Sequence, residues 1–265
     1  MSKATLHAIL GFFAVIAVLI VIFLLAYRDQ SADAAMVLVR RASLLIFGAR
    51  DFGTVEGGFV ANIGISLVSM LIATVLGVSL GGATTAPNPM VRNTAIVIVN
   101  LMRNSPWLVV LYAMLYLIPF RLNLFGMTFW VSPVAKAMIG LAVPVTAYMA
   151  EVFRMGIQSV PATQWEAAQA LGYRRGAILR RIILPQAIPQ MLPNIMTTYA
   201  MLTIGTSLVV VTGAKDVLSF AKTIIASDGD DYATAVYLFV LFLFFIYCYP
   251  IAAASRAIER RIKGR

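Results

Sequence analysis

The chain has 265 residues, of which 61% are hydrophobic and 12% charged, and its formal net charge is +10. A soluble domain keeps roughly a quarter of its residues charged because its surface faces water, so this composition excludes an ordinary soluble protein. A positive charge without a nucleic-acid recognition motif is typical of the cytoplasmic loops of a membrane protein. We therefore expect a lipid bilayer, and no nucleic acid, around this chain.

Six apolar stretches reach the length of about 20 residues that a membrane-spanning helix needs. In chain order they cover residues 8–27, 59–83, 94–120, 134–152, 194–212 and 232–253. The first is longer than the roughly 7–15 apolar residues of a signal peptide, so we expect it to be retained. The sequence thus predicts an all-α polytopic membrane protein with about six transmembrane helices. We divide it into residues 1–58 (a first span and an outer segment), a transmembrane domain over 59–253 and a basic tail over 254–265.

Basic residues predict the orientation. The connection over residues 153–193 carries five arginines, and the tail carries four arginines and one lysine. Lys and Arg collect in cytoplasmic loops, so both segments are predicted to be cytoplasmic, and counting spans places the N-terminus there as well. The apolar segment 32–49, with two arginines at its centre, is then outside, where we expect an amphipathic helix along the membrane interface.

The 153–193 connection contains a predicted short helix. Thr163 and Glu166 have the spacing of a capping box at its start. Gly172 stands where a residue of left-handed conformation ends a helix. A helix of this length is marginal by itself in water, so we expect it to bind a partner surface.

The partner-binding face of this helix is predicted to consist of Trp165, Ala168 and Leu171. Beyond the helix, prolines recur at four-residue spacing, at Pro185, Pro189 and Pro193. Because proline breaks or kinks a regular helix, we expect a kinked elbow that leads back into the membrane.

Polar residues within the spans leave alternatives open. An uncompensated arginine inside a span costs about 2.5–3.5 kcal/mol on insertion scales, so Arg103 needs either a structural ion pair or a wet solute path. Glu151 and Arg154, three residues apart, are expected to pair on one helix face. Thr206 and Ser207 either bond back to their own helix or line the path.

Several of these segments, in order, resemble the permease subunits of binding-protein-dependent ABC importers, in their polar amino acid subfamily. The resemblance rests on EAAQALG at residues 166–172 followed by ILPQA at 183–187, which are similar to the cytoplasmic EAA loop of that family. The segments AYMAEVFR at 147–154, RNSP at 103–106 and TSL at 206–208 support it. Together they cover roughly residues 62 to 258.

The resemblance implies a five-helix permease core with one extra N-terminal span, and an EAA helix that docks on a separate ATPase. It assigns coupling to the ATPase to Glu166, Ala167, Ala168, Leu171 and Gly172. It makes Arg103, Thr206 and Ser207 candidates for the translocation path. The chain departs from the family in two places. Thr163 replaces a common glycine, and Ile204-Gly205 replaces a common Lys-Asp near the path, so the solute stays open.

The expected function is that of a permease subunit in the bacterial inner membrane, for a polar amino acid or a related small solute such as an opine-like compound. By resemblance its partners are two ABC ATPase subunits, a second permease subunit (identical or homologous) and a periplasmic solute-binding protein. The chain is not expected to be an enzyme, because it has no phosphate-binding Gly-x-x-x-x-Gly-Lys-Ser/Thr run. ATP and Mg would be bound by the ATPase.

One histidine and one cysteine exclude a His/Cys metal site in this chain. The first alternative is a secondary transporter driven by an ion gradient, which calls for acidic residues near the midplane and inverted repeats. The second is a membrane scaffold that transports nothing, which gives no reason for a partner-binding cytoplasmic helix.

Overall fold

The structure, a computed structural model, describes residues 3–51, 54–124 and 126–263. Within these ranges five helices are long and apolar enough to cross a membrane, or six if the bent pair Pro89–Arg103 and Trp107–Leu117 forms one span. The prediction of an all-α polytopic membrane protein is therefore confirmed. Two short antiparallel hairpins are the only sheets in the described part.

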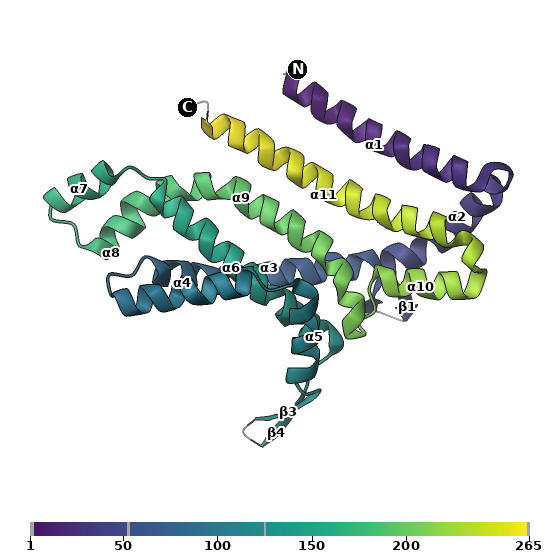
Figure 1. Cartoon of the computed structure of the whole chain (residues 1–265), viewed down its shortest axis with the longest axis horizontal. Helices are drawn as coiled ribbons and strands as arrows, with labels where there is room; N and C mark the ends of the chain where they lie inside the picture. Colours follow the sequence, from purple (N-terminus) through teal and green to yellow (C-terminus); the bar gives the residue numbers. More distant parts are fainter. Residues whose placement is uncertain (1–2, 52–53, 125, 264–265) are drawn as a thin grey trace.

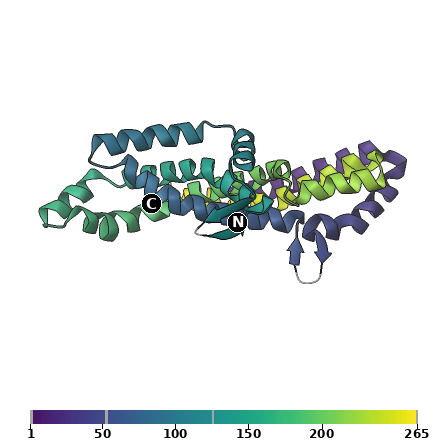
Figure 2. The same ribbon diagram turned by 90° about the horizontal axis from the view of Figure 1, so that it is seen from below.

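The elements follow one another along an elongated molecule (Figures 1 and 2). The first part contains α1 (Lys3–Tyr27), η1 (Arg28–Gln30), α2 (Ser31–Phe47), β1 (Ala49–Asp51), β2 (Thr54–Glu56) and α3 (Gly58–Thr84). Next come α4 (Pro89–Arg103), α5 (Trp107–Leu117), β3 (Arg121–Leu124), β4 (Met127–Trp130), α6 (Pro133–Gln158), α7 (Ala162–Ala170), α8 (Arg175–Ile178) and the π-helical turn η2 (Leu179–Ile183). The last part contains α9 (Leu184–Gly205), η3 (Thr206–Thr212), α10 (Val217–Asp228), η4 (Asp230–Tyr232) and α11 (Ala233–Lys263).

The two ends of the molecule differ in content. Figure 1 shows α7 and α8 at one end of the long axis and α2 and α10 at the other. The helices α1, α3, α9 and α11 run between these ends, and α5 with the β3–β4 hairpin projects to the side away from α1 (Figure 1). The hairpin pairs Arg121 with Trp130.

The centre of the molecule is the contact between α3 and α6, and small residues permit it. A Cβ atom added at Gly77 would lie 2.5 Å from Cβ of Met149, and one at Gly81 would lie 2.6 Å from the carbonyl oxygen of Ala150. Close helix approach through small residues four apart is a recurrent packing device in membranes. The Gly77/Gly81 pair therefore marks the face of α3 that packs on α6.

A buried asparagine joins three elements near the α10 end. Asn62 of α3 is fully buried. Its Nδ2 donates to Oγ1 and to the carbonyl oxygen of Thr206, at 3.1 and 3.3 Å, and its Oδ1 accepts from the N–H of Val217 at 3.0 Å. These bonds tie α3 to η3 and to the first residue of α10.

Replacing Asn62 by leucine is expected to lower the free energy of unfolding by about 1–3 kcal/mol, because the buried N–H of Val217 loses its acceptor. The measurement is the thermal unfolding midpoint of the purified protein in detergent. Asn93→Leu is the control, because Asn93 is exposed on α4. Equal midpoints for the two variants would contradict the role given to Asn62.

The predicted helix in the segment 32–49 is present up to Phe47, where α2 ends, and it packs on the protein. Arg41 of α2 makes a bidentate salt bridge to Asp228 at the end of α10, with N–O distances of 2.6 and 2.9 Å. This hydrogen bond from Arg41 holds the pKa of the Asp228 carboxyl below its ordinary value. The bridge therefore fastens the N-terminal segment to the transmembrane domain.

The stabilisation from this bridge is expected to vanish in acid. Because the pKa of Asp228 is lowered in the folded state, its contribution is complete above the unfolded pKa and is lost as pH falls through the folded value. The difference in unfolding midpoint between wild type and Asp228→Asn should therefore be constant between pH 7 and 5 and begin to shrink as pH falls below about 4. A difference that does not shrink at all below pH 4 would show that Asp228 acts otherwise. High salt should reduce the difference, since the pair is partly exposed.

One predicted span is interrupted. The stretch 94–120 is not one helix, because α4 and α5 meet at an angle of 101°. Pro106 cannot donate a backbone hydrogen bond, and the side chains of Asn104 and Ser105 bond the carbonyls of Asn100 and Leu101, four residues earlier. Asparagine, serine and proline in succession thus end the helix inside the span.

At the three prolines of the 153–193 connection, by contrast, the chain is more regular than expected. The helix is not broken at Pro189 and Pro193, which lie inside the continuous helix α9. Each proline stands four residues after the previous one, so the missing N–H groups fall on one stripe and the rest of the ladder is kept. The irregularity lies earlier, in the π-helical turn Leu179–Ile183.

Candidate functional site

The short helix of the 153–193 connection is α7, at the end of the molecule opposite α2 and α10 (Figure 1). The capping-box prediction is wrong: the N-cap position is Pro161, it has no side-chain cap, and Thr163 lies within the first turn. Proline suits this entry because its fixed φ is close to the value of −54° found here. Glu166 is thereby left exposed.

The predicted end of this helix is confirmed. Gly172 has a φ of +77°, in the left-handed region that favours glycine. The N–H of Tyr173 bonds the carbonyl of Ala168 at 3.1 Å, and the N–H of Gly172 bonds that of Gln169 at 2.9 Å. This is the Schellman pattern of helix termination. It fixes the direction in which the chain leaves α7 for α8.

The chain itself covers part of the predicted partner-binding face. Ala168 is 2% exposed and Trp165 is half-buried, and both pack with Ile178 and Ile183 in a cluster formed by this end of the chain. Leu171, by contrast, is 77% exposed. The chain's own α8 and η2 cover one face of α7, because a helix of nine residues buries its apolar side on the nearest element. The free face carries Glu166, Ala167 and Leu171.

Arg103 reaches a cavity inside the helix bundle. Its Nη1 lies 4.0 Å from a carboxylate oxygen of Glu151, which also accepts hydrogen bonds of 2.5 and 3.0 Å from Arg154. The predicted pairing of Glu151 with Arg154 is confirmed. Arg103 and Glu151 line a cavity of about 310 Å³ together with Tyr148, Val152, Met155, Asn194, Thr197, Thr198 and Met201. Both alternatives for Arg103 are thus present in one place, an ion pair and a cavity.

Thr206 and Ser207 are not brought to this cavity. Thr206 is fully buried. Its Oγ1 accepts a hydrogen bond from Asn62 and donates one to the carbonyl of Thr203 at 2.6 Å. Ser207 is half-buried one residue further along η3. The geometry gives Thr206 a role in holding η3 against α3, so these two residues stand apart from Arg103.

The departure at residues 204–205 has a visible consequence. A Cβ atom at Gly205 would lie 2.4 Å from the indole of Trp107, so any larger residue would displace that ring. Trp107 also packs on Tyr148, with ring centroids 6.3 Å apart. Tyr148 lines the cavity, so an aromatic wall supported by Gly205 borders one side of it.

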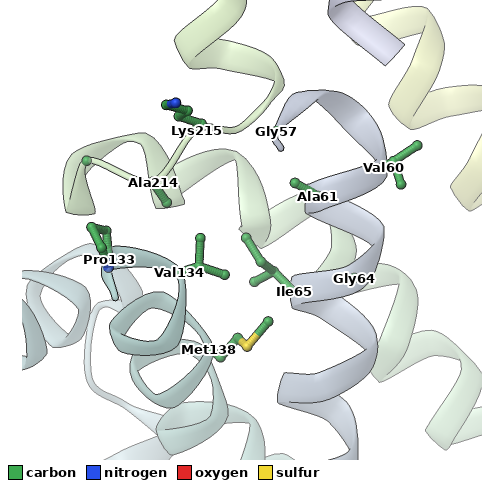
Figure 3. A pocket seen from close by; sticks show the side chains of 11 residues that line it. Gly57, Val60, Ala61, Gly64, Ile65, Pro133, Val134, Met138, Ala214 and Lys215 are labelled. Carbon is green, nitrogen blue, oxygen red and sulfur yellow. The ribbon is translucent and has the colours of Figure 1, made fainter. Parts of the chain in front are cut away.

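A second cavity opens nearer the α10 end, between α3, α6 and the loop after η3 (Figure 3). It has a volume of about 490 Å³. Its lining is mainly apolar, with Ile65, Val134 and Met138 among its side chains and Lys215 at its edge. The two cavities lie at different heights along α6, because residues 133–138 line this one and residues 148–155 line the one around Arg103.

Lys136 is a buried residue that the sequence analysis missed. It is 1% exposed, its Nζ donates to the carbonyl of Leu115 at 3.0 Å, and it lies 3.2 Å from the ring centroid of Phe120. It therefore satisfies a free carbonyl at the C-terminus of α5, where a cation is favourable. A lysine three residues after the turn-forming Ser132-Pro133 was the available signal, but its partner is 21 residues away.

No group of three or more His, Cys, Asp or Glu side chains that could hold a metal occurs within the described ranges. Arg103 and Glu151 form an ion pair between α4 and α6, and Glu151 and Arg154 form one within α6.

Known proteins resemble this chain in sequence. Residues 73–264 match the family described as binding-protein-dependent transport system inner membrane component. A probable amino-acid ABC transporter permease protein, y4tF of Sinorhizobium fredii, is 30% identical over 79% of this chain and 87% of its own length. The L-cystine transport system permease protein TcyB of Bacillus subtilis is 30% identical over 78% of this chain and 86% of its own length.

Solved structures share the architecture at lower sequence identity. A chain from the crystal structure of an amino acid ABC transporter with histidines superposes with a TM-score of 0.69, at 23% identity, over 85% of this chain and 97% of that one. The MetNI methionine ABC transporter in an inward-facing conformation gives a TM-score of 0.61, at 23% identity, over 77% and 94%. The chain described here therefore belongs to the family of binding-protein-dependent transport system inner membrane components.

Proposed function

We propose that this chain is the permease subunit of an ATP-driven importer and that it conducts a polar amino acid or a closely related zwitterion. Membership of the family supports the transport function, and the two relatives are named for amino-acid and L-cystine transport. The observation that carries the solute class is the cavity lined by both Arg103 and Glu151. A zwitterion offers a carboxylate to the first and an ammonium group to the second.

The geometry of this pair suits exchange with a solute. At 4.0 Å the Arg103–Glu151 contact is at the limit of an ion pair, whereas Arg154 holds Glu151 at hydrogen-bonding distance. A solute carboxylate can therefore take Arg103 while Glu151 stays fixed by Arg154. Charge-assisted bonds of this kind are roughly twice as strong as neutral ones. Asn194 and Thr197 supply further polar groups to the cavity.

Energy reaches the cavity through α7, which we assign as the coupling helix for a separate ATPase. Its exposed Glu166, Ala167 and Leu171 face the partner. Ala168 is buried and holds the helix against α8, and Gly172 sets the direction in which the chain leaves α7. The cluster that holds Ala168 also contains Met191 of α9, and α9 lines the cavity through Thr198. A displacement of α7 thus acts on the helix that borders the solute site.

The assembly follows from the same assignment. Two ATPase subunits, which bind ATP and Mg, act on the α7 helices of two permease subunits, identical or homologous. A periplasmic binding protein delivers solute at the α2–α10 end, so the α7 end and both termini are cytoplasmic. Alternating access then arises because the nucleotide state of the ATPase favours one of two arrangements of the membrane helices.

The test is uptake into vesicles that contain the complex of this chain with its ATPase and binding protein. We expect uptake of an amino acid that depends on ATP and continues when ionophores remove every ion gradient. Uptake that stops with the ionophores and ignores ATP would instead identify a secondary transporter. Binding of candidate amino acids to the cognate binding protein identifies the solute.

A further inference from the structure

The segment between the coupling helix and the membrane carries a cluster of unpaired arginines. Arg174 and Arg175 lie at the start of α8, and Arg180 and Arg181 lie in the π-helical turn η2. All four are exposed, and within the described part of the chain none makes an ion pair or a side-chain hydrogen bond. Four clustered positive charges without an internal partner require an external anion or remain fully hydrated.

The last two arginines border a hollow in the surface. Its volume is about 540 Å³, and it is lined by Gly176, Ala177, Arg180 and Arg181. A Cβ atom at Gly176 would meet no other atom within 4 Å, so the hollow is open above this residue. The π-helical turn keeps the successive side chains of Arg180 and Arg181 exposed together at this hollow, whereas Ile178 and Ile183 point into the protein.

The position of this hollow relative to the bilayer follows from helix length. The apolar segment that contains it runs from Arg175 to Thr212, 38 residues, or about 57 Å at 1.5 Å per residue. The hydrocarbon core is only about 30 Å thick. The segment is therefore too long to lie wholly in the hydrocarbon, and its arginine-bearing first turns are the end that lies outside it, because charged side chains are costly in the hydrocarbon.

The exposed surface changes from basic to apolar along the same helix. Pro185, Ile188 and Leu192 are exposed at positions i, i+3 and i+7 of α9, and Arg181 stands four residues before the first of them. Ile188 is 54% and Leu192 40% exposed. Such a face matches the profile of a phospholipid, with arginines at the depth of the phosphate and aliphatic side chains at the depth of the acyl chains.

We propose that the hollow bordered by Arg180 and Arg181 binds the headgroup of an anionic phospholipid from the leaflet that α9 enters. Basic pockets beside transmembrane helices recognise such headgroups, and each cation near the surface contributes about 1 kcal/mol. The bound lipid anchors the base of α7 and α8, because Ile178 and Ile183 join Trp165 and Ala168 in one cluster. This site is independent of the solute that the protein carries.

An acidic surface of a partner protein is the competing occupant of these arginines. The structure favours lipid for two reasons. The exposed residues of α7 offer a separate surface for a protein partner, and the apolar residues that continue the arginine face would be unpaired in a water-filled contact. The experiment below separates the two occupants.

The test uses the purified full-length chain in detergent, with phosphatidylglycerol or phosphatidylcholine added and bound lipid counted by native mass spectrometry. We expect wild type to retain phosphatidylglycerol and the Arg180→Gln/Arg181→Gln variant to bind it about 30-fold more weakly, from two lost charges. Gly176→Leu should fill the hollow and weaken binding without changing charge. Arg260→Gln/Arg261→Gln, which removes two exposed arginines from α11, is the matched control and should bind as wild type.

Three results would overturn the proposal. The first is equal loss of phosphatidylglycerol from the α11 control, which would show general attraction by charge. The second is displacement of the lipid by an equal concentration of inorganic phosphate, which would identify a soluble anion as the ligand. The third is unchanged lipid binding by Arg180→Gln/Arg181→Gln together with loss of the co-purifying ATPase, which would assign the arginines to a protein contact.

Discussion

Replacing Gly172 by proline is expected to abolish solute uptake while leaving the transmembrane domain folded. Gly172 has a φ of +77°, which the pyrrolidine ring excludes, and its N–H bonds the carbonyl of Gln169. Losing this backbone conformation and this hydrogen bond destabilises the observed end of α7 by about 3 kcal/mol. The conformation in which α7 can dock on the ATPase therefore becomes roughly 100-fold less populated. The measurements are ATP-driven uptake in vesicles and the unfolding midpoint of the purified protein.

Gly172→Asn is the matched control for this prediction. Asparagine adopts the left-handed conformation more readily than other non-glycine residues and keeps the N–H, and the space around Gly172 is open. We expect this variant to transport within about threefold of wild type. If Gly172→Pro transports at the normal rate, α7 does not couple the ATPase to the membrane helices. If its unfolding midpoint collapses, the change has damaged the fold and the control decides whether φ is the cause.

Local chemistry in the sequence was sufficient to predict several features. Gly172 ends its helix and Glu151 pairs with Arg154, because each depends on residues within one or two turns. The membrane spans follow from uninterrupted apolar length. The hydrophobic pattern does not reveal a break inside such a stretch, so the turn between α4 and α5 was missed although Asn104-Ser105-Pro106 contains its cause.

Features that depend on remote partners could not be predicted. Asn62 bonds Thr206, which lies 144 residues away in the chain, and Val217, which lies 155 residues away. The fold alone decides that Thr206 bonds Asn62 and does not join Arg103. The face of α7 was misassigned for the same reason, since Ala168 is covered by Ile178 and Ile183 from the following elements. Exposure in a short helix depends on its neighbours as much as on its own sequence.

Arg103→Gln is expected to weaken uptake through the apparent affinity for the solute. The variant removes the cation proposed to receive the solute carboxylate, a charge-assisted contact worth about 1.5–3 kcal/mol, which corresponds to an increase in KM of roughly 10- to 150-fold. The unfolding midpoint should change little, because Glu151 keeps its bonds to Arg154. The measurement is the dependence of the uptake rate on solute concentration, with the binding protein present at a concentration that saturates the transporter.

Arg92→Gln provides the control, because Arg92 belongs to the same helix α4 and is exposed, yet does not line the cavity. It removes the same charge and should leave KM unchanged. A normal KM for Arg103→Gln together with a lowered unfolding midpoint would make Arg103 a structural partner of Glu151 only. An increase in KM at an unchanged unfolding midpoint requires the solute to contact Arg103. An ion pair that only held α4 on α6 would change the stability and would leave the solute concentration for half-maximal uptake unchanged.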